Sequence, residues 1–134
     1  MTKRVVITTT IFSLIVVSLV FVAATAPIGS AEKAAAFVQS LGWIIDEKPI
    51  ESAFVDIPKV FDSVYENYNA LQKEAGFDLS EYRGKRVMRY TFAVKNFDGE
   101  ENVRANVLTY RGKIIGGDLM TVAIDGFMIP LKKR

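Results

Sequence analysis

The chain has 134 residues, of which 50% are hydrophobic and 24% are charged, so it has room for one domain with a buried core beside any targeting segment. It contains no cysteine and no histidine, which excludes disulfides, thiolate chemistry, a Ser-His-Asp triad and nearly all zinc or haem sites. The formal net charge is +2, but residues 32–134 carry 15 basic and 15 acidic side chains, so a nucleic-acid partner is not indicated.

The first predicted element is a hydrophobic segment close to the N-terminus. Lys3 and Arg4 precede it, and within residues 5–26 sixteen of twenty-two side chains are apolar. A helix of about twenty such residues spans a bilayer. The basic residues before the segment, with Glu32 as the first charge after it, favour an N-terminus inside the cell and a domain outside. We therefore expect residues 1–30 to be a signal anchor or a signal peptide, with the transmembrane part at about 5–26.

Cleavage of this segment is an open alternative. Ala24, Thr25 and Ala26 form a small-residue site, but Pro27 follows directly and would hinder the extended binding that a signal peptidase requires. The residues at 29–31 offer a second, weaker site. A retained segment gives a single-pass protein of the cell membrane, whereas a cleaved one gives a secreted domain.

Residues 31–134 are expected to form an extracytoplasmic α+β domain. A short helix is predicted at 31–41, where Ser30 can cap its start and Gly42 can end it. The runs at 43–45 and 53–55 are predicted to be two short strands.

A longer helix is predicted from Pro58, a residue suited to a first helical turn, to the stop signal at Gly76. Its apolar residues are spaced by threes and fours, which predicts a stripe facing the core. The stripe consists of Phe61, Val64, Tyr65, Tyr68, Leu71 and Ala75. The opposite face is expected to be solvated and carries Lys59, Asp62, Glu66, Asn69, Lys73 and Glu74. Tyr65 and Tyr68 either belong to the core, the commoner case, or line a ligand groove.

The remainder is predicted to be β structure. Residues 87–96 alternate in polarity as a half-buried strand does, with Met88, Tyr90, Phe92 and Val94 on one side. A turn at 98–101 leads to a strand at 103–110, a second turn at 111–113 reverses the chain, and 114–124 supplies one or two more strands. The fold expected is one N-terminal membrane helix followed by a small domain, in which a long helix packs on an antiparallel sheet.

One concentrated basic patch is present in the domain, formed by Arg83, Lys85, Arg86 and Arg89. It could bind an anionic envelope polymer or a lipid headgroup, but the more common outcome is that such arginines pair with acidic side chains or stay solvated. Residues 32–81 hold 4 basic and 10 acidic residues, while 82–134 hold 11 basic and 5 acidic ones. We therefore expect the two halves to pack together and partly neutralise each other.

Other motifs carry weaker signals. The glycines of Gly116-Gly117-Asp118 lack the lysine and helix start of a phosphate loop, so a bulge or a close backbone approach is predicted. The carboxylates at 98–102 lack the ligand spacing of a calcium loop.

A hydrolase needs only two acids at a fixed distance, and the candidates for such a pair are Asp46, Glu47, Glu51, Asp118 and Asp125. Nothing in their spacing singles out a pair, so no catalytic residue, metal or cofactor is assigned.

A family resemblance rests on several short motifs spread along the domain. They are Leu41-Gly42-Trp43, Ile57-Pro58, Tyr65 to Tyr68, Leu71-Gln72-Lys73, Gly76-Phe77-Asp78-Leu79, Tyr82-Arg83-Gly84-Lys85, Arg89-Tyr90-Thr91, Arg104-Ala105-Asn106, Gly116-Gly117-Asp118 and Asp125-Gly126-Phe127-Met128. Together they resemble an uncharacterised family of Gram-positive bacterial proteins that is catalogued as a domain of unknown function. The similarity covers residues 31–129 and implies a small membrane-anchored or secreted protein, without an activity, cofactor or catalytic residue.

The function predicted from these observations is a membrane-tethered, extracytoplasmic, non-enzymatic module that binds an envelope protein or an anionic envelope polymer. A first alternative is an inhibitor or regulatory domain of an envelope enzyme. A second alternative is a carboxylate-based cell-wall hydrolase.

Overall fold

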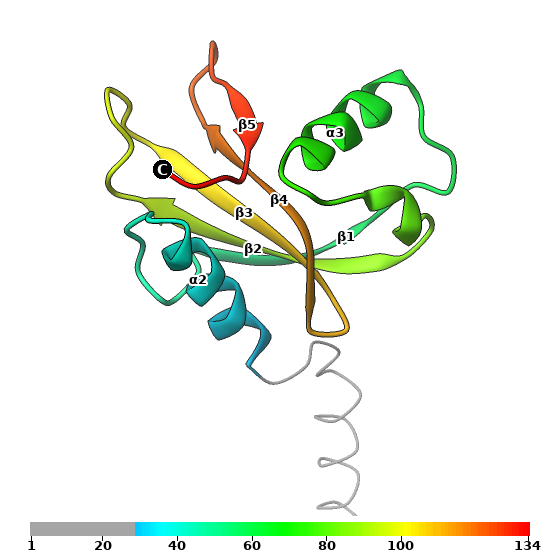
Figure 1. Cartoon of the computed structure of the whole chain (residues 1–134), viewed down its shortest axis with the longest axis horizontal. Coiled ribbons are helices and arrows are strands. Elements are labelled where there is room, and N and C mark those ends of the chain that lie inside the picture. The colour runs from blue at the N-terminus through cyan, green and yellow to red at the C-terminus, as the bar shows by residue number, and fades with distance from the viewer. Residues whose placement is uncertain (1–28) are drawn as a thin grey trace, which may run out of the picture.

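The computed structural model describes residues 29–134, which form a five-stranded antiparallel sheet in the order β1-β2-β3-β4-β5 with helices packed on it (Figure 1). The elements are α2 (Ser30–Ser40), β1 (Glu51–Asp56), α3 (Ser63–Glu74), the 3-10 helix η1 (Leu79–Tyr82), β2 (Arg86–Val94), β3 (Val103–Tyr110), β4 (Lys113–Thr121) and β5 (Met128–Pro130). The expected α+β domain with an antiparallel sheet is thus confirmed. The membrane segment predicted at 5–26 lies outside the described residues, and within 29–134 no helix has the length and apolar character to cross a membrane.

One face of the sheet is covered by α2. Successive residues of a strand point to opposite faces. Tyr90 and Phe92 of β2 therefore share a face with Val107 of β3, and Ala34 and Val38 of α2 complete this core cluster. The alternation predicted for β2 is confirmed, because its even-numbered side chains form the apolar face.

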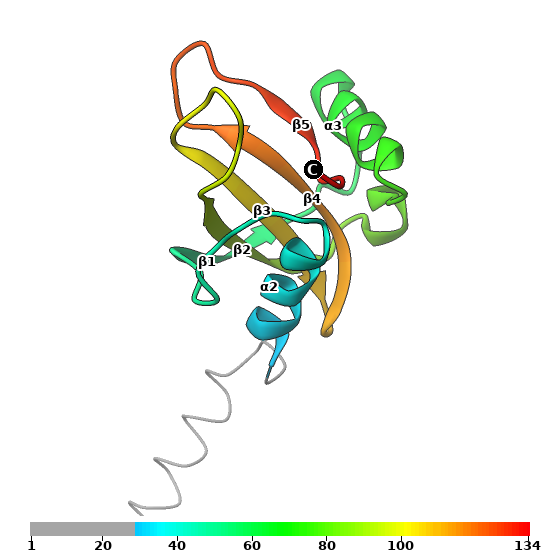
Figure 2. The same cartoon turned by 60° about the vertical axis from the view of Figure 1, so that its left-hand side comes forward.

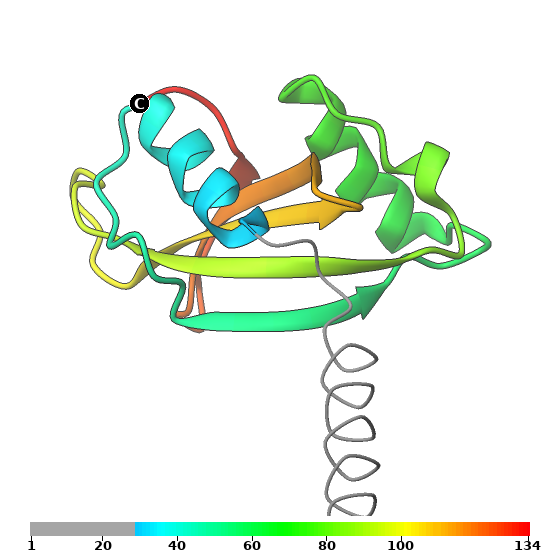
Figure 3. The same cartoon turned by 90° about the horizontal axis from the view of Figure 1, so that it is seen from below.

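The other face is covered by α3 and η1. Val87, Leu108 and Ile115 point to this side and form a second core cluster with Ile57 and Leu79. Figures 2 and 3 show β4 passing between α2 and α3. The sheet therefore has an α2 face and an α3 face, and both are packed.

The start of the domain differs in detail from the prediction. Ser30 is not the cap of α2, because Gly29 holds that position with a φ of 84° and Ser30 begins the helix. The Ser30 hydroxyl instead hydrogen-bonds the buried Tyr90 hydroxyl. Gly42 does end the helix, with a φ of 95°.

The predicted strand at 43–45 is wrong, because these residues form a packed loop. Trp43 and Ile45 are buried in the first core cluster, and the Trp43 indole Nε1 donates to the Lys132 carbonyl at 2.8 Å. The Ile44 amide donates to the side chain of Asn96 at 2.8 Å. The Ile44 carbonyl accepts from the Lys95 amide at 2.9 Å, so the backbone of Ile44 is hydrogen-bonded on both sides without a strand ladder. The strand predicted at 53–55 lies within β1 and is confirmed.

The long helix starts five residues after Pro58, the start that was predicted. Ile57 continues the β pairing: its amide donates to Lys85 O at 2.9 Å, and the Gly84 amide donates to Ile57 O at 2.9 Å. These bonds hold the chain extended as it reaches Pro58. Asp62 then caps α3 by accepting from the Tyr65 amide at 2.8 Å. Gly76 follows the helix with a φ of 87°, as expected.

The later strands match the prediction closely. β3 has the predicted bounds, and the turn before it contains Gly99 with a φ of 77°. Arg111 and Gly112 form the next turn with φ values of 49° and 79°, as a tight hairpin turn requires. β4 begins at Lys113, one residue before the predicted range of 114–124, and ends within that range, whereas β5 lies beyond residue 124, where no strand was predicted.

The glycine pair of β4 combines a bulge with a close approach, as predicted. The pairing of β3 with β4 shifts register between Leu108 and Thr109, opposite Gly116 and Ile114. A Cβ on Gly116 would meet the Gln72 Oε1 atom of α3 at 2.8 Å. A Cβ on Gly117 would collide with the carbonyl oxygen of Asn106 and with Leu131 Cδ2, at 2.6 Å from the latter.

We expect Gly117→Ala to lower the free energy of unfolding by about 2 kcal/mol, because the methyl group would press on β3 backbone that cannot move aside. Gly116→Ala should cost less, because its methyl group would meet side-chain atoms of Gln72 and Leu79, at 2.8 and 3.2 Å, and not backbone. Urea unfolding of the full chain in mild detergent, followed by the fluorescence of the single, buried Trp43, measures both changes. Equal stabilities for the two variants would contradict this reading of the contact.

Candidate functional site

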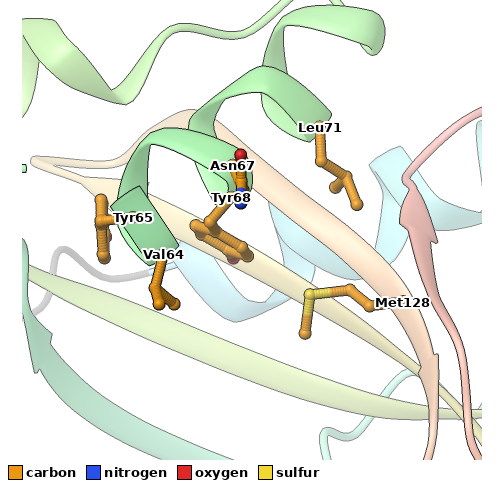
Figure 4. A pocket seen from close by; sticks show the side chains of 6 residues that line it. All are labelled: Val64, Tyr65, Asn67, Tyr68, Leu71 and Met128. Atoms are coloured by element: carbon orange, nitrogen blue, oxygen red, sulfur yellow. The ribbon is translucent and has the colours of Figure 1, made fainter. Parts of the chain in front are cut away.

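An open apolar groove of about 490 Å³ lies beside α3. Its lining residues are Val64, Tyr65, Asn67, Tyr68, Leu71 and Met128. The first five come from α3 and the last from β5, and Figure 4 shows their side chains converging between the helix and the strands. We call this feature the α3 groove.

The groove exists because α3 buries polar side chains. Asn69 is 2% exposed and Gln72 is 0% exposed, and they are the buried residues of the helix. The prediction that Asn69 faces solvent is therefore wrong. Val64, expected in the core, is 73% exposed at the side of the groove. The apolar stripe is real, but part of it stays open to solvent.

Tyr65 and Tyr68 combine the two roles considered for them. Both are partly buried and pack against the second core cluster, and both also line the groove. The Tyr65 ring lies 4.6 Å from Phe61 and 5.6 Å from Tyr68, measured between centroids. This aromatic row supports the groove at the N-terminal half of α3.

Hydrogen bonds that become fully buried behind Tyr68 link the groove to three strands. The Tyr68 hydroxyl donates to Asp118 Oδ2 at 3.0 Å, and Asn106 Nδ2 donates to Asp118 Oδ1 at 3.0 Å. The Thr91 hydroxyl donates to Asn106 Oδ1 at 2.7 Å. Tyr68 is thereby held in one orientation by β4, β3 and β2 in succession.

Burial is the largest influence on the pKa values of Asp118 and Tyr68 in this network. Desolvation raises the pKa of the Asp118 carboxyl, while the bonds from Asn106 and Tyr68 and the charge of Arg89 act in the opposite direction. Burial, followed by the charge of Asp118, raises the pKa of the Tyr68 hydroxyl, which therefore stays protonated as a donor. Both oxygens of Asp118 already accept hydrogen bonds, so the carboxylate serves to position Tyr68.

A second polar anchor holds the C-terminal half of α3. Asn69 Oδ1 accepts from the Leu79 amide at 2.7 Å, and Asn69 Nδ2 donates to Asp78 Oδ1 at 3.0 Å. Hydrogen bonds from Asn69 and Ser80 lower the pKa of Asp78 to about 2. Gln72 Oε1 accepts from the Gly117 amide at 2.8 Å. The helix is thus fastened to the following segment and to β4.

The four residues of the predicted basic patch lie near one another in the chain but do not share one surface. Arg86 and Arg89 are three positions apart in β2, so their side chains point to opposite faces of the sheet. Arg83 stacks over the Phe61 ring at 4.5 Å, and Lys85 is exposed just before β2. A role for these four residues in an interaction stays a prediction.

Ion pairs join the acidic and basic halves of the domain. The five pairs among residues 29–134 are Arg83–Glu66, Arg86–Asp56, Arg89–Glu51, Lys95–Asp46 and Arg134–Asp98. The first four connect a basic residue after position 82 with an acidic residue before it. The expected packing and partial neutralisation of the two halves is therefore confirmed.

The candidate carboxylates for a hydrolase occupy different surroundings. Asp46 pairs with Lys95 at 2.7 Å, Glu51 pairs with Arg89 at 2.8 Å, and Glu47 and Asp125 are exposed. Asp118 is the only one of the five that is buried. Within residues 29–134 no group of three or more carboxylates is placed to hold a metal ion.

Residues 37–119 match the model of a protein family described as Domain of unknown function (DUF4830). The matched range runs from α2 into β4 and contains every lining residue of the α3 groove except Met128. No curated protein and no solved structure matches the chain.

The raised pKa of Asp118 predicts a pH-dependent stability. The folded state holds the Asp118 proton more tightly than the unfolded state, so stability should fall as the pH rises above the ordinary carboxyl pKa of 3.8 towards the raised value. Asp118→Asn should remove this part of the pH dependence. Denaturation midpoints from about pH 4 upwards measure it, with Asp125→Asn as the control for an exposed carboxylate. Parallel curves for the wild type and Asp118→Asn would contradict the prediction.

Proposed function

The chain belongs to the DUF4830 family of domains of unknown function, and we propose that it is a membrane-tethered extracytoplasmic module that binds an apolar segment of another protein in the α3 groove. The tether and the binding site lie in different parts of the chain and are supported by different features.

The tether is supported by the amino-acid sequence before the domain. Residues 5–26 are predominantly apolar and uncharged, with Lys3 and Arg4 on one side and Glu32 beyond the other. This arrangement is typical of a helix that crosses the bilayer once and leaves the following domain outside. Pro27 disfavours cleavage after Ala26 and hence favours retention.

The observation that carries the binding role is the exposed apolar lining of the α3 groove. Val64 is 73% and Met128 44% exposed, although the same helix buries Asn69 and Gln72. Covering apolar surface releases about 25 cal/mol per Å², so a partner that fills the groove gains binding free energy from these side chains.

The composition of the lining indicates the kind of partner. None of the six lining side chains is charged, and Asn67 is the one amide among them. Val64, Tyr68 and Leu71 follow one another at helical spacing, so the apolar surface runs along α3. An elongated apolar segment of a protein, such as one side of a helix, matches this surface better than a charged polymer does.

A position-specific crosslink tests the binding site in intact cells. A photoreactive amino acid at Asn67, in the groove, should capture a defined partner, whereas the same group at Gln39, on the exposed side of α2, should not. Val64→Asp should abolish the Asn67 crosslink. Ile44→Asp is the matched control, because Ile44 is 57% exposed and lies in a loop between α2 and β1.

With the captured protein purified, we expect Val64→Asp to weaken its binding at least about tenfold, which corresponds to 1.4 kcal/mol, and Ile44→Asp to leave it unchanged. Circular dichroism of both variants confirms that they are folded. Equal capture from Asn67 and Gln39, or equal weakening by the two substitutions, would overturn the assignment of the groove.

The tether predicts an intact chain in the membrane fraction. Mass spectrometry of the mature protein should give the mass of the full sequence, because Pro27 hinders cleavage after Ala26. Loss of the first 26 or 31 residues would show that the segment is a cleaved signal peptide and would refute the tether.

A further inference from the structure

Cationic side chains surround the turn between β3 and β4. Arg111 and Gly112 form this turn, and Lys113 follows as the first residue of β4. The Lys33 Nζ atom, from the first turn of α2, donates to the Gly112 carbonyl oxygen at 3.2 Å. Figures 1 and 2 both show the β3–β4 turn beside the start of α2. We call the set of Lys33, Arg111 and Lys113 the hairpin end.

The charge of the hairpin end is not neutralised by the rest of the domain. All three side chains are exposed, and none of them forms an ion pair with a residue in the range 29–134. Two acidic residues, Asp78 and Glu81, line a small cavity together with Lys113, and Glu32 precedes Lys33 in α2.

Two more cations lie at the same end of the sheet. The start of β2 is beside the end of β3, and the Tyr82 ring contacts the Tyr110 ring at 5.7 Å between centroids. Arg83 and Lys85, which follow Tyr82, therefore extend the positive surface. Arg83 is partly neutralised by Glu66, whose carboxylate is 3.9 Å away.

At the opposite end of the sheet, the connections between strands contain acidic residues. The turn between β2 and β3 contains Asp98, Glu100 and Glu101, and the connection from β4 to β5 contains Asp125. Of these four residues only Asp98 pairs with a cation, Arg134, within residues 29–134. The cations Lys95, Lys132, Lys133 and Arg134 also lie towards this end, so its charge is mixed. The β3–β4 turn, beside the start of α2, carries cations without an acidic residue.

We infer that the hairpin end binds an anionic phospholipid surface and so holds the domain upright on the membrane. This inference rests on the proposed tether, because a membrane segment ahead of Gly29 places the start of α2 next to the bilayer. Each Lys or Arg near an anionic leaflet strengthens association about fivefold, so the three cations together supply a factor on the order of a hundred. A hundredfold gain in association is modest for a domain free in solution. It is sufficient to orient a tethered domain, because the tether already holds the hairpin end close to the lipid.

With the hairpin end against the bilayer, the orientation of the domain also determines which way the α3 groove faces. Met128 pairs with Met120 close to the end of β4, far from the β3–β4 turn. Contact between the hairpin end and lipid therefore leaves the β5 side of the groove turned away from the bilayer, where a partner protein can reach it.

The test uses the full chain reconstituted in vesicles of phosphatidylcholine with or without phosphatidylglycerol. Because the chain has no cysteine, Val122→Cys introduces one labelling site at the far end of β4. Energy transfer from this dye to acceptors on lipid headgroups reports how far the labelled end of the domain lies from the bilayer. We compare the parent with Lys33→Gln/Arg111→Gln/Lys113→Gln and, as a control of equal charge, Lys48→Gln/Lys132→Gln/Lys133→Gln.

In vesicles with phosphatidylglycerol, we expect energy transfer for the hairpin-end variant to be about twice that of the parent and of the control, since the labelled end of the variant is no longer held away from the bilayer. High salt should raise the transfer of the parent to the same level. If the hairpin-end variant and the parent give equal transfer, or if the control changes as much, the inference is wrong. It is also wrong if dissolved polyphosphate binds these side chains more tightly than the vesicles do.

Flotation separates this inference from the proposed tether. Failure of the full chain to float with pure phosphatidylcholine vesicles refutes the tether, and with it the orientation that depends on the tether. If the parent and both variants float alike but the parent and the hairpin-end variant give equal energy transfer, the hairpin end alone is refuted.

Discussion

The attachment of α3 by polar side chains is the constraint on which the rest of the α3 face depends. Gln72 accepts from the Gly117 amide and Asn69 accepts from the Leu79 amide, so directional bonds to the backbone set the rotation of the helix. At 3.6 residues per turn, Asn69 and Gln72 lie roughly 100° around the helix axis from the row of Val64, Tyr68 and Leu71. Burial of the polar pair therefore leaves the apolar row at the side, where it lines the groove with Met128.

Much of the fold was predictable because local signals agree with the tertiary structure. The alternating strand at β2, the glycine turn at Gly112 and the helix stop at Gly76 all follow from backbone chemistry that acts over a few residues. The errors arise where a distant partner overrides such a signal. Pro58 does not start a helix because Ile57 pairs with Lys85, and the run at 43–45 is not a strand because its side chains fill the core.

The candidate site was predictable only in part, for the same reason. The apolar stripe of α3 could be read from its spacing, and Tyr65 and Tyr68 were considered as groove residues. The burial of Asn69 could not be foreseen, because its partners Asp78 and Leu79 meet it only through the turn after α3. Nor does any local pattern place Met128 or Asp118 beside the helix. Their positions depend on strand order and register, which set Asp118 opposite Asn106.

The contact between Ser30 and Tyr90 has a mechanical consequence. Ser30 follows Gly29 directly, and its hydroxyl is bonded to a tyrosine in the second strand of the sheet. Force applied to the chain ahead of Gly29 is therefore passed to the centre of the fold at its first helical residue, with no slack segment in between to absorb it. Gly29 is itself joined to the helix, because its carbonyl accepts from the Lys33 amide at 3.0 Å. The domain should therefore move as one stiff unit with the chain that enters it at Gly29, and a bound partner would stay within a fixed short reach of that point.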